Sequence, residues 1–217
     1  MDTVTLFITA CNRPDLLKIT LESFLKFNTY PIYEAIIMED SGKEGINDFV
    51  KDILPFPCTI YYNNPKRGQM KSIEYGSQFI KTPYVFHCEE DWEFYNSGFI
   101  EKSFEILQQD TTITSVLLLP FSYFSINNNK FSIPIMKPQK KEYWICGTWD
   151  YFGRFFGHFS FNPGLRTLEV HKAHMPFPEN FGEKDLSAEF HKKGMKCAVI
   201  NFPEGYVRHI GWNRHVE

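Results

Sequence analysis

Three consecutive carboxylates, Glu89, Glu90 and Asp91, concentrate negative charge at one point of the sequence. They follow the apolar run 84–86, which predicts a buried strand. Side chains at the carboxyl end of a strand in an open α/β sheet lie where such sheets bind ligands. Adjacent like charges repel, which lowers stability unless a cation or hydrogen-bond donors compensate. The run is therefore either a ligand or metal site or an acidic, solvated turn.

Polar side chains also follow three other predicted strands. The strands are residues 4–9, 33–38 and 59–62, and they are followed by Asn12-Arg13, Glu39-Asp40 and Lys66-Arg67 respectively. The carboxyl ends of parallel strands meet at one edge of a sheet, so four such ends would converge on one rim. This convergence favours a ligand site over a solvated turn.

Helical periodicity separates several of these strands. Apolar residues repeat at helical spacing over residues 17–28 and again over 69–81. The resulting β-α-β-β-α-β order predicts an α/β fold with a mostly parallel central sheet flanked by helices. Further along the chain the pattern predicts helices at 99–109 and 182–193 and strands at 113–119, 196–200 and 206–210.

Composition narrows the class of protein. The 217 residues suffice for one substantial core, and 43% hydrophobic with 23% charged residues is typical of a globular protein. The net charge of −3 gives no reason to expect a nucleic-acid partner. Five cysteines without a CxxC pair suggest free thiols in a reducing compartment. With no signal peptide and no apolar run of membrane-spanning length, we expect a cytoplasmic protein without an integral membrane segment.

Three features have both a structural and a functional interpretation. The aromatic residues within 120–165 are either core or one wall of a binding cleft. His171 and His174 have helical metal-ligand spacing, but no third ligand is evident, which favours surface histidines. The C-terminal 212–215 run is either a flexible tail or a flap.

Taken in order, the motifs resemble those of the GT-A fold nucleotide-sugar glycosyltransferases, particularly the family-2 type. Residues 7–14 resemble the family's first strand with its T-x-x-N-R-P turn, and residues 38–42 its second-strand acidic motif. Glu89–Asp91 stands where the family has its metal-binding DXD motif. The resemblance covers most of the chain and implies a single compact GT-A (Rossmann-like) domain, with residues 1–95 as nucleotide-sugar-binding half and 96–217 as acceptor-binding half.

The resemblance also implies residue roles on the donor side. Residues of the nucleotide-sugar pocket would be Thr9, Arg13, Asp40, Arg67, Glu89, Glu90 and Asp91. A divalent cation, Mn²⁺ or Mg²⁺, would be bound by Asp91 and completed by His209; the alternative for His209 is a structural histidine at a strand end. UDP is the family's commonest nucleotide, so UDP is the expected donor carrier.

On the acceptor side, the resemblance aligns Glu183 with the family's catalytic acid when Leu186 and Gly194 take their usual places. The family usually has Asp there, so Asp185 stays open as the alternative. Either carboxylate would remove a proton from an acceptor hydroxyl, and direct attack would invert the anomeric carbon. Both could instead be acidic residues stabilising the first turn of a helix.

The implied function is a metal-dependent, inverting glycosyltransferase that moves a sugar from a nucleoside-diphosphate sugar to a hydroxyl of a glycan or glycoconjugate. One alternative is a nucleotidyltransferase that makes sugar nucleotides, but residues 10–15 lack the glycine-rich, basic loop of that class. The other is a nucleotide-sugar-binding module of the same fold that has lost catalysis.

Overall fold

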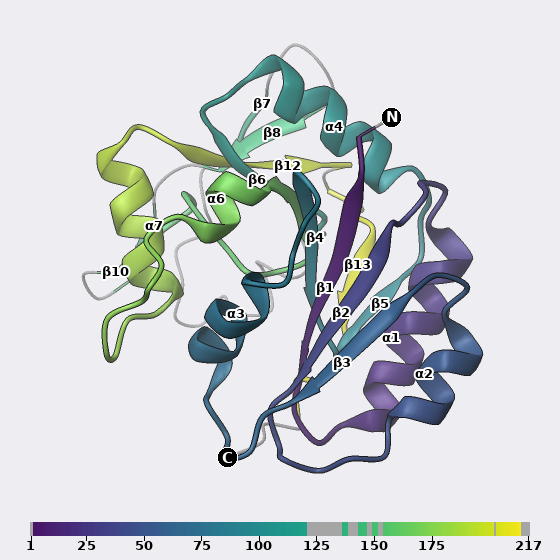
Figure 1. Ribbon diagram of the computed structural model, residues 1–217. Coiled ribbons are helices and arrows are strands. Elements are labelled where there is room, and N and C mark those ends of the chain that lie inside the picture. Colours follow the sequence, from purple (N-terminus) through teal and green to yellow (C-terminus); the bar gives the residue numbers. More distant parts are fainter. Residues whose placement is uncertain are drawn as a thin grey trace.

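A nine-stranded sheet forms the centre of the molecule (Figure 1). The computed structural model describes residues 2–120, 136–138, 143–146, 149–151, 154–201 and 203–213. In sheet order the strands are β3 (Cys58–Tyr62), β2 (Glu34–Glu39), β1 (Val4–Ala10), β4 (Tyr84–Glu89), β11 (Gly164–Thr167), β6 (Ile113–Leu117), β12 (Lys196–Ile200), β8 (Tyr143–Cys146) and β7 (Met136–Pro138).

The first four strands of this order are parallel. β1 pairs with β2 and β4, and β2 pairs with β3, each in parallel register. Their carboxyl ends therefore meet at one edge, where Thr9 lies opposite both Met38 and Glu89. The predicted α/β fold, a mostly parallel central sheet with flanking helices in one compact domain, is confirmed.

Helices cover both faces of the sheet (Figure 1). Helices α1 (Pro14–Phe27), α2 (Asn47–Ile53) and α4 (Phe99–Gln109) pack their apolar side chains, such as Phe24 and Phe99, into one core cluster. Helices α3 (Gln69–Ser77) and α7 (Glu183–Lys192) contribute Ile73, Leu186 and Phe190 to a second cluster on the other face, against which the short α6 (Leu168–Lys172) also packs.

Helix α2 is absent from the predicted order, which has β2 followed directly by β3. Parallel neighbours need a crossover connection, and α2 provides it. The helix spans only 7 residues, of which Val50 alone is buried. A single buried position produces too little periodicity for a helix to be predicted.

Strand β11 is also absent from the predicted elements. It lies between β4 and β6 and runs antiparallel to both. Two short pairs stand outside the main sheet: β5 (Trp92–Phe94) with β13 (Val207–His209), and β9 (Trp149–Tyr151) with β10 (Arg154–Phe156), both antiparallel. The first pair brings the C-terminal part of the chain to the end of β4.

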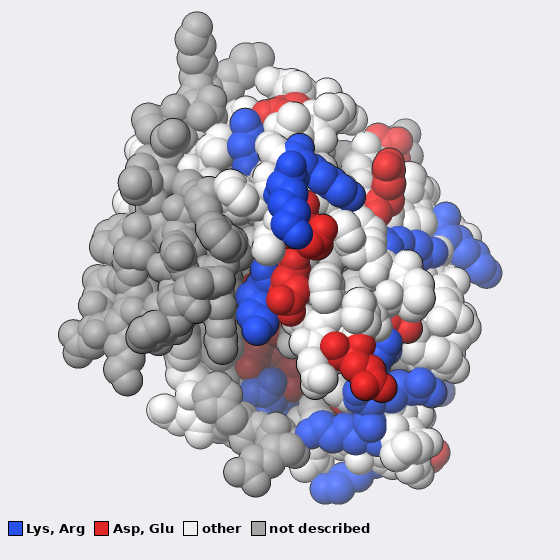
Figure 2. Space-filling view, turned by 90° about the vertical axis from the view of Figure 1, so that its left-hand side faces the viewer, with Lys and Arg blue, Asp and Glu red and all other residues white. Residues whose placement is uncertain are grey.

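Within the described residues, no helix is long and apolar enough to cross a membrane. All five cysteines are free thiols. On the face shown in Figure 2, basic and acidic side chains intermingle over the described residues instead of forming one large basic area. The division of the chain into a donor half and an acceptor half stays a prediction.

Candidate active site

A cavity of about 470 Å³ opens at the carboxyl ends of β1, β2 and β4. It is lined by Thr9, Ala10, Cys11, Arg13, Asp40, Lys66, Gly68, Gln69, Ser72, Glu89, Glu90, Asp91 and His209. Seven of the predicted site residues are in this set: Thr9, Arg13, Asp40, Glu89, Glu90, Asp91 and His209. The polar strand ends thus converge on one rim.

The three consecutive carboxylates have different partners. Glu90 is 3% exposed and accepts hydrogen bonds from the backbone N–H of Cys11 (3.0 Å) and from Nε of Arg13 (2.8 Å). Burial raises its pKa, and the Arg13 charge opposes that rise. Glu90 therefore fastens the β1–α1 loop to the end of β4.

Glu89 lies on the cavity side of the same run. Its carboxylate accepts hydrogen bonds from Nε2 of Gln69 at 2.6 Å and from Nε1 of Trp92 at 3.1 Å. Burial, the charge of Asp91 and, more weakly, that of Glu183 raise the pKa of Glu89 to about 8. Neither Glu183 nor Asp185 is among the residues that line the cavity.

Asp91 joins Arg13 to His209. Its Oδ2 atom lies 2.9 Å from Nη1 of Arg13 and 3.3 Å from Nε2 of His209. Burial acts to raise the pKa of Asp91, but the hydrogen bond and charge of His209, together with Arg13, outweigh burial and hold it below its ordinary value. The N–H of Ile210 donates to the carbonyl of Asp91 (2.9 Å), which fixes β13 over this carboxylate.

Asp40 directly follows β2 and fastens the loop that follows β3. Oδ1 accepts hydrogen bonds from Nδ2 of Asn63 (2.9 Å) and the N–H of Arg67 (2.8 Å), and Oδ2 accepts from the N–H of Gly68 (2.8 Å). A carboxylate offers about four lone-pair sites, so the three donors leave one site for a ligand in the cavity. Glu39 acts similarly on the first loop by accepting from the N–H of Asn12 (3.0 Å).

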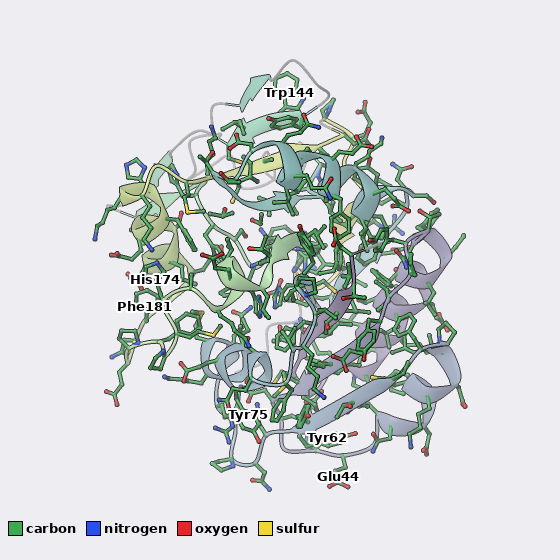
Figure 3. The ribbon with its side chains drawn as sticks, turned by 45° about the horizontal axis from the view of Figure 1, so that its top comes forward. Glu44, Tyr62, Tyr75, Trp144, His174 and Phe181 are labelled. Carbon is green, nitrogen blue, oxygen red and sulfur yellow. The ribbon has the colours of Figure 1, made fainter. Side chains whose placement is uncertain are left out.

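Arg67 is the predicted donor-pocket residue outside the cavity. Its guanidinium carbon lies 4.4 Å from the ring centre of Tyr75 on α3, which is labelled in Figure 3. It lines an adjoining groove that shares Gly68 and Gln69 with the cavity and includes Phe181. Arg67 is therefore at the edge of the cavity, not inside it.

Glu183 and Asp185 occupy the first turn of α7 but have different surroundings. Glu183 accepts hydrogen bonds from the N–H of Phe161 (2.9 Å) and from Oγ of Ser160 (3.2 Å). Burial raises its pKa, while the Phe161 and Ser160 hydrogen bonds and the Arg166 charge lower it. Asp185 instead accepts from the N–H of Gly182 at 2.8 Å, a helix-capping contact.

Several cavity residues carried no prediction as site residues. Lys66 and Gln69 lie in the loop after β3 and at the start of α3, and Ser72 is fully buried on α3. Lys66 belongs to the Lys66-Arg67 pair that follows the predicted strand 59–62, and this place at a strand end is the sequence feature that indicates a site residue. Gln69 and Ser72 have no such signal, because helix-surface polar residues are usually solvated.

The aromatic region is described only in part. Phe159 and Phe161 are 1% exposed and belong to the second core cluster, and Trp144 packs against the first. The side chains of Trp149, Phe155 and Phe156 lie outside the described residues, as do Arg214 and His215 of the C-terminal run. For the described part, the core interpretation is the one observed.

His171 and His174 do not form a metal pair. His171 is buried and its Nε2 lies 2.9 Å from Oγ of Ser77. His174, labelled in Figure 3, has its ring centre 5.5 Å from that of Phe190 on α7 and its Nε2 3.3 Å from Nζ of Lys193. The two rings therefore have separate partners.

Comparison with known families decides the class of this site. The family model described as "Glycosyl transferase family 2" matches residues 5–166, which include the strands and loops that carry most of the cavity. The chain belongs to glycosyl transferase family 2. The predicted resemblance is thereby confirmed, and glycosyl transfer is the enzyme class of the family.

Solved structures agree on the fold of this family-2 chain. The mannosyltransferase PcManGT from Pyrobaculum calidifontis, in complex with GDP-Man and Mn²⁺, superimposes with a TM-score of 0.67 at 15% identity. The match covers 97% of this chain and 57% of that one. GalNAc-T7, with UDP, GalNAc and Mn²⁺, gives 0.66 at 14% identity, covering 100% and 45%. The chain thus spans about half the length of these structures, and no curated protein sequence matches it.

Proposed function

We propose that the chain transfers a glycosyl group from a nucleoside-diphosphate sugar to a hydroxyl of a glycan or glycoconjugate, with inversion at the anomeric carbon. The observation that carries this proposal is the convergence of Asp91 and His209 in the cavity at the strand ends. Glu183, held at the start of α7 by Ser160 and the N–H of Phe161, is the candidate base. The two similar structures were solved with nucleotide sugars or their parts and Mn²⁺, which supports the same donor class here.

The donor would bind across the β1, β2 and β4 ends. A cavity of about 470 Å³ falls within the range of small-molecule sites. Thr9 and the remaining acceptor site of Asp40 would contact the nucleoside, while Lys66 and Arg67 would face the diphosphate side. Arg suits that role because its fork of donors matches phosphate oxygens. We assign Glu89 and Glu90 to the same pocket, Glu89 as the carboxylate nearer the sugar.

Asp91 and His209 suit a divalent cation such as Mn²⁺ or Mg²⁺. Oδ2 of Asp91 and Nε2 of His209, which lie 3.3 Å apart, would be the protein atoms that hold the cation. No group of three His, Cys, Asp or Glu side chains suited to a metal occurs among the described residues, so diphosphate oxygens and water would supply the other ligands. When bound, the cation would neutralise charge on the leaving diphosphate.

Glu183 would act as the general base. Its side chain is half-buried, and two hydrogen bonds from the chain fix its orientation. It would accept the proton of the acceptor hydroxyl as that oxygen bonds to the anomeric carbon, while the bond to the diphosphate breaks and its electron pair leaves with the diphosphate. A single displacement of this kind inverts the anomeric centre. Asp185, already occupied in capping α7, is the weaker candidate.

The donor's nucleobase can be identified by binding. UDP follows from the family resemblance, and the similar structures carry GDP-Man in one case and UDP in the other. Thermal unfolding should therefore be followed with UDP, GDP, CMP and dTDP, each with and without Mn²⁺. A ligand that binds the folded state raises the midpoint by mass action.

We expect one nucleotide to raise the midpoint only with Mn²⁺, and Asp91→Ala to abolish that rise. Glu93→Gln is the matched control. Glu93 is also a carboxylate and lies two residues from Asp91, but it pairs with Arg208, whose side chain is 66% exposed. If no nucleotide raises the unfolding midpoint, the cavity does not bind a nucleotide donor and the proposal is contradicted. A rise without any glycosyl transfer would favour the binding module that has lost catalysis.

A further inference from the structure

Arg166 is a buried cation in the middle of the sheet. It lies on β11 with 0% exposure, and its guanidinium carbon is 4.9 Å from the ring centre of Phe159 and 5.5 Å from that of Phe161. Nη2 makes a long contact of 3.5 Å with the carbonyl of Asn162. Its Nε and Nη1 have no hydrogen-bond partner among the described residues. Burying an uncompensated charge costs on the order of several kcal/mol. The burial of the Arg166 guanidinium is therefore unfavourable by itself and points to a role for its charge.

Arg166 and Glu183 contact the same short piece of chain, residues 159–162. Arg166 packs on Phe159 and Phe161 and reaches Asn162. The same piece binds Glu183 through Oγ of Ser160 and the N–H of Phe161. Ser160 also accepts a hydrogen bond from the N–H of Asn162 at 3.1 Å, which links the two sets of contacts. Any shift of Arg166 is thereby transmitted to the groups that hold the Glu183 carboxylate.

Two buried histidines complete the surroundings of Arg166. Nδ1 of His87 lies 2.7 Å from the carbonyl of Phe161. A carbonyl only accepts, so Nδ1 carries the proton and Nε2 is a lone pair. Oγ of Ser77 donates to the carbonyl of Ile73, so it accepts from Nε2–H of His171, and Nδ1 of His171 is also a lone pair.

These imidazoles are neutral neighbours of a permanent charge. Nε2 of His87 and Nδ1 of His171 are buried without a hydrogen-bond partner among the described residues, as are Nε and Nη1 of Arg166. The ring centres of the two histidines are 6.0 Å apart. Burial and, after it, the charge of Arg166 lower both histidine pKa values well below the ordinary value. Two buried imidazole lone pairs and two buried guanidinium nitrogens therefore lack partners, and the charge that acts on both histidines is that of Arg166.

We propose that Arg166 is a positioning residue for Glu183, which holds residues 159–162 in place and sets a permanent positive charge behind the carboxylate they bind. The inference rests on the proposed function in one respect, the role of Glu183 as base. A base must be ionised to accept a proton, and burial opposes ionisation. Arg166 opposes the effect of burial without occupying a carboxylate oxygen that the acceptor hydroxyl needs.

The other ionisable groups that act on Glu183 cannot replace this charge. Glu89 on β4 and Cys197 on β12 have pKa values that burial raises, and the only charge that either can carry is negative, so neither stabilises an ionised Glu183. Arg166 on β11 is the cation whose charge lowers the pKa of Glu183. Burial lowers the pKa of Arg166 itself to about 10, so it stays charged at neutral pH.

The direct test is the titration of Glu183 in protein labelled with ¹³C at glutamate carboxyls, with the Glu183 signal assigned by its loss in Glu183→Gln. Arg166→Met and Arg166→Gln remove the charge with different shapes, so one variant serves if the other fails to fold. We expect the Glu183 midpoint to rise by about one pH unit in either, and kcat below that midpoint to fall about tenfold, since one unit is a tenfold change in ionised fraction. Arg166→Lys should keep the midpoint and lower kcat through the lost ring contacts.

Leu165→Ala is the matched control. Leu165 is the preceding residue on β11, is fully buried and belongs to the opposite core cluster, so its loss weakens the strand without touching residues 159–162. The control should leave the Glu183 midpoint unchanged. An unchanged midpoint in both charge-removing variants would overturn the inference, whatever their stability. The titration needs no substrate, so it remains readable even if Glu183→Gln transfers sugar normally and the proposed role of Glu183 fails.

Discussion

Nε2 of His209 lies 3.3 Å from Oδ2 of Asp91, although the two residues come from distant parts of the chain. The antiparallel pairing of β13 with β5 produces this contact, because His209 lies directly opposite Trp92. The C-terminal strand is therefore part of the cavity wall that the N-terminal strands begin. Substitutions around Asp91 should affect the cavity and the stability of the fold together.

Removal of Arg13 from its ion pair with Glu90 and Asp91 should destabilise the fold far more than removal of Arg208 from its exposed pair with Glu93. Arg13 is 14% exposed and its partners 4% and 7%, so Arg13→Gln leaves buried carboxylates without their cation. Loss of one partner of a buried pair costs about 3–5 kcal/mol. Arg208→Gln is the control, with an expected cost below about 1 kcal/mol. Urea unfolding measures both, and equal losses would contradict the prediction.

Gly211 should tolerate no side chain, because it lies against Asp91. A Cβ atom there would overlap Oδ2 of Asp91 and lie 2.9 Å from Nη1 of Arg13. Gly211→Ala should therefore displace the pair, cost about 1–3 kcal/mol as overpacking does, and abolish any Mn²⁺-dependent binding of nucleotide. Gly182→Ala is the control, since the nearest atom to its Cβ, Oδ2 of Asp185, is 3.8 Å away.

Calorimetric titration of the nucleotide into both glycine variants gives the comparison. The control should bind as the parent protein does. Parent-like binding by Gly211→Ala would show that the packing of Gly211 on Asp91 does not matter to the cavity.

Glu183 should make the fold less stable as the pH rises. Its pKa is raised in the folded state by burial, so between about pH 4.3, the unfolded value, and the folded pKa the folded state binds more protons than the unfolded state. Stability then falls as pH increases through this window. Glu183→Gln removes the titrating group, so its free energy of unfolding should decline less with pH.

Urea unfolding of the parent protein and of Glu183→Gln from pH 4.5 to 8 measures the difference. The stability of the variant relative to the parent should grow with pH across this range. A constant difference would mean that Glu183 ionises equally readily in both states.

The donor side of the fold follows from sequence because its strands are local apolar runs. Val4–Ala10 is buried throughout, and parallel pairing with β2 and β4 then requires the polar strand ends to meet. The order of strands and helices along the chain is therefore enough to place Thr9, Asp40 and Asp91 at one edge of the sheet. The exact loop contacts do not follow in this way, since they depend on side-chain geometry.

The remaining elements depend on distant parts of the chain. Strand β11 has 4 residues and contains a buried arginine, so neither its length nor its pattern indicates a strand between β4 and β6. The role of Gly211 likewise comes from packing against residues far away in the sequence. Glu183 and Asp185 lie in the same first turn of α7, so the sequence does not distinguish them. Their different hydrogen-bond partners do.

The most direct measurement compares the release of nucleoside diphosphate by the parent protein, Glu183→Gln and Asp185→Asn, with the donor and acceptor found by screening. Loss of a general base lowers turnover about 10²–10⁴-fold. We expect that loss in Glu183→Gln with nucleotide binding retained, and near-parental turnover in Asp185→Asn with about 1 kcal/mol lost from the helix cap. Parental turnover by Glu183→Gln, or the large loss in Asp185→Asn instead, would contradict the account of this site.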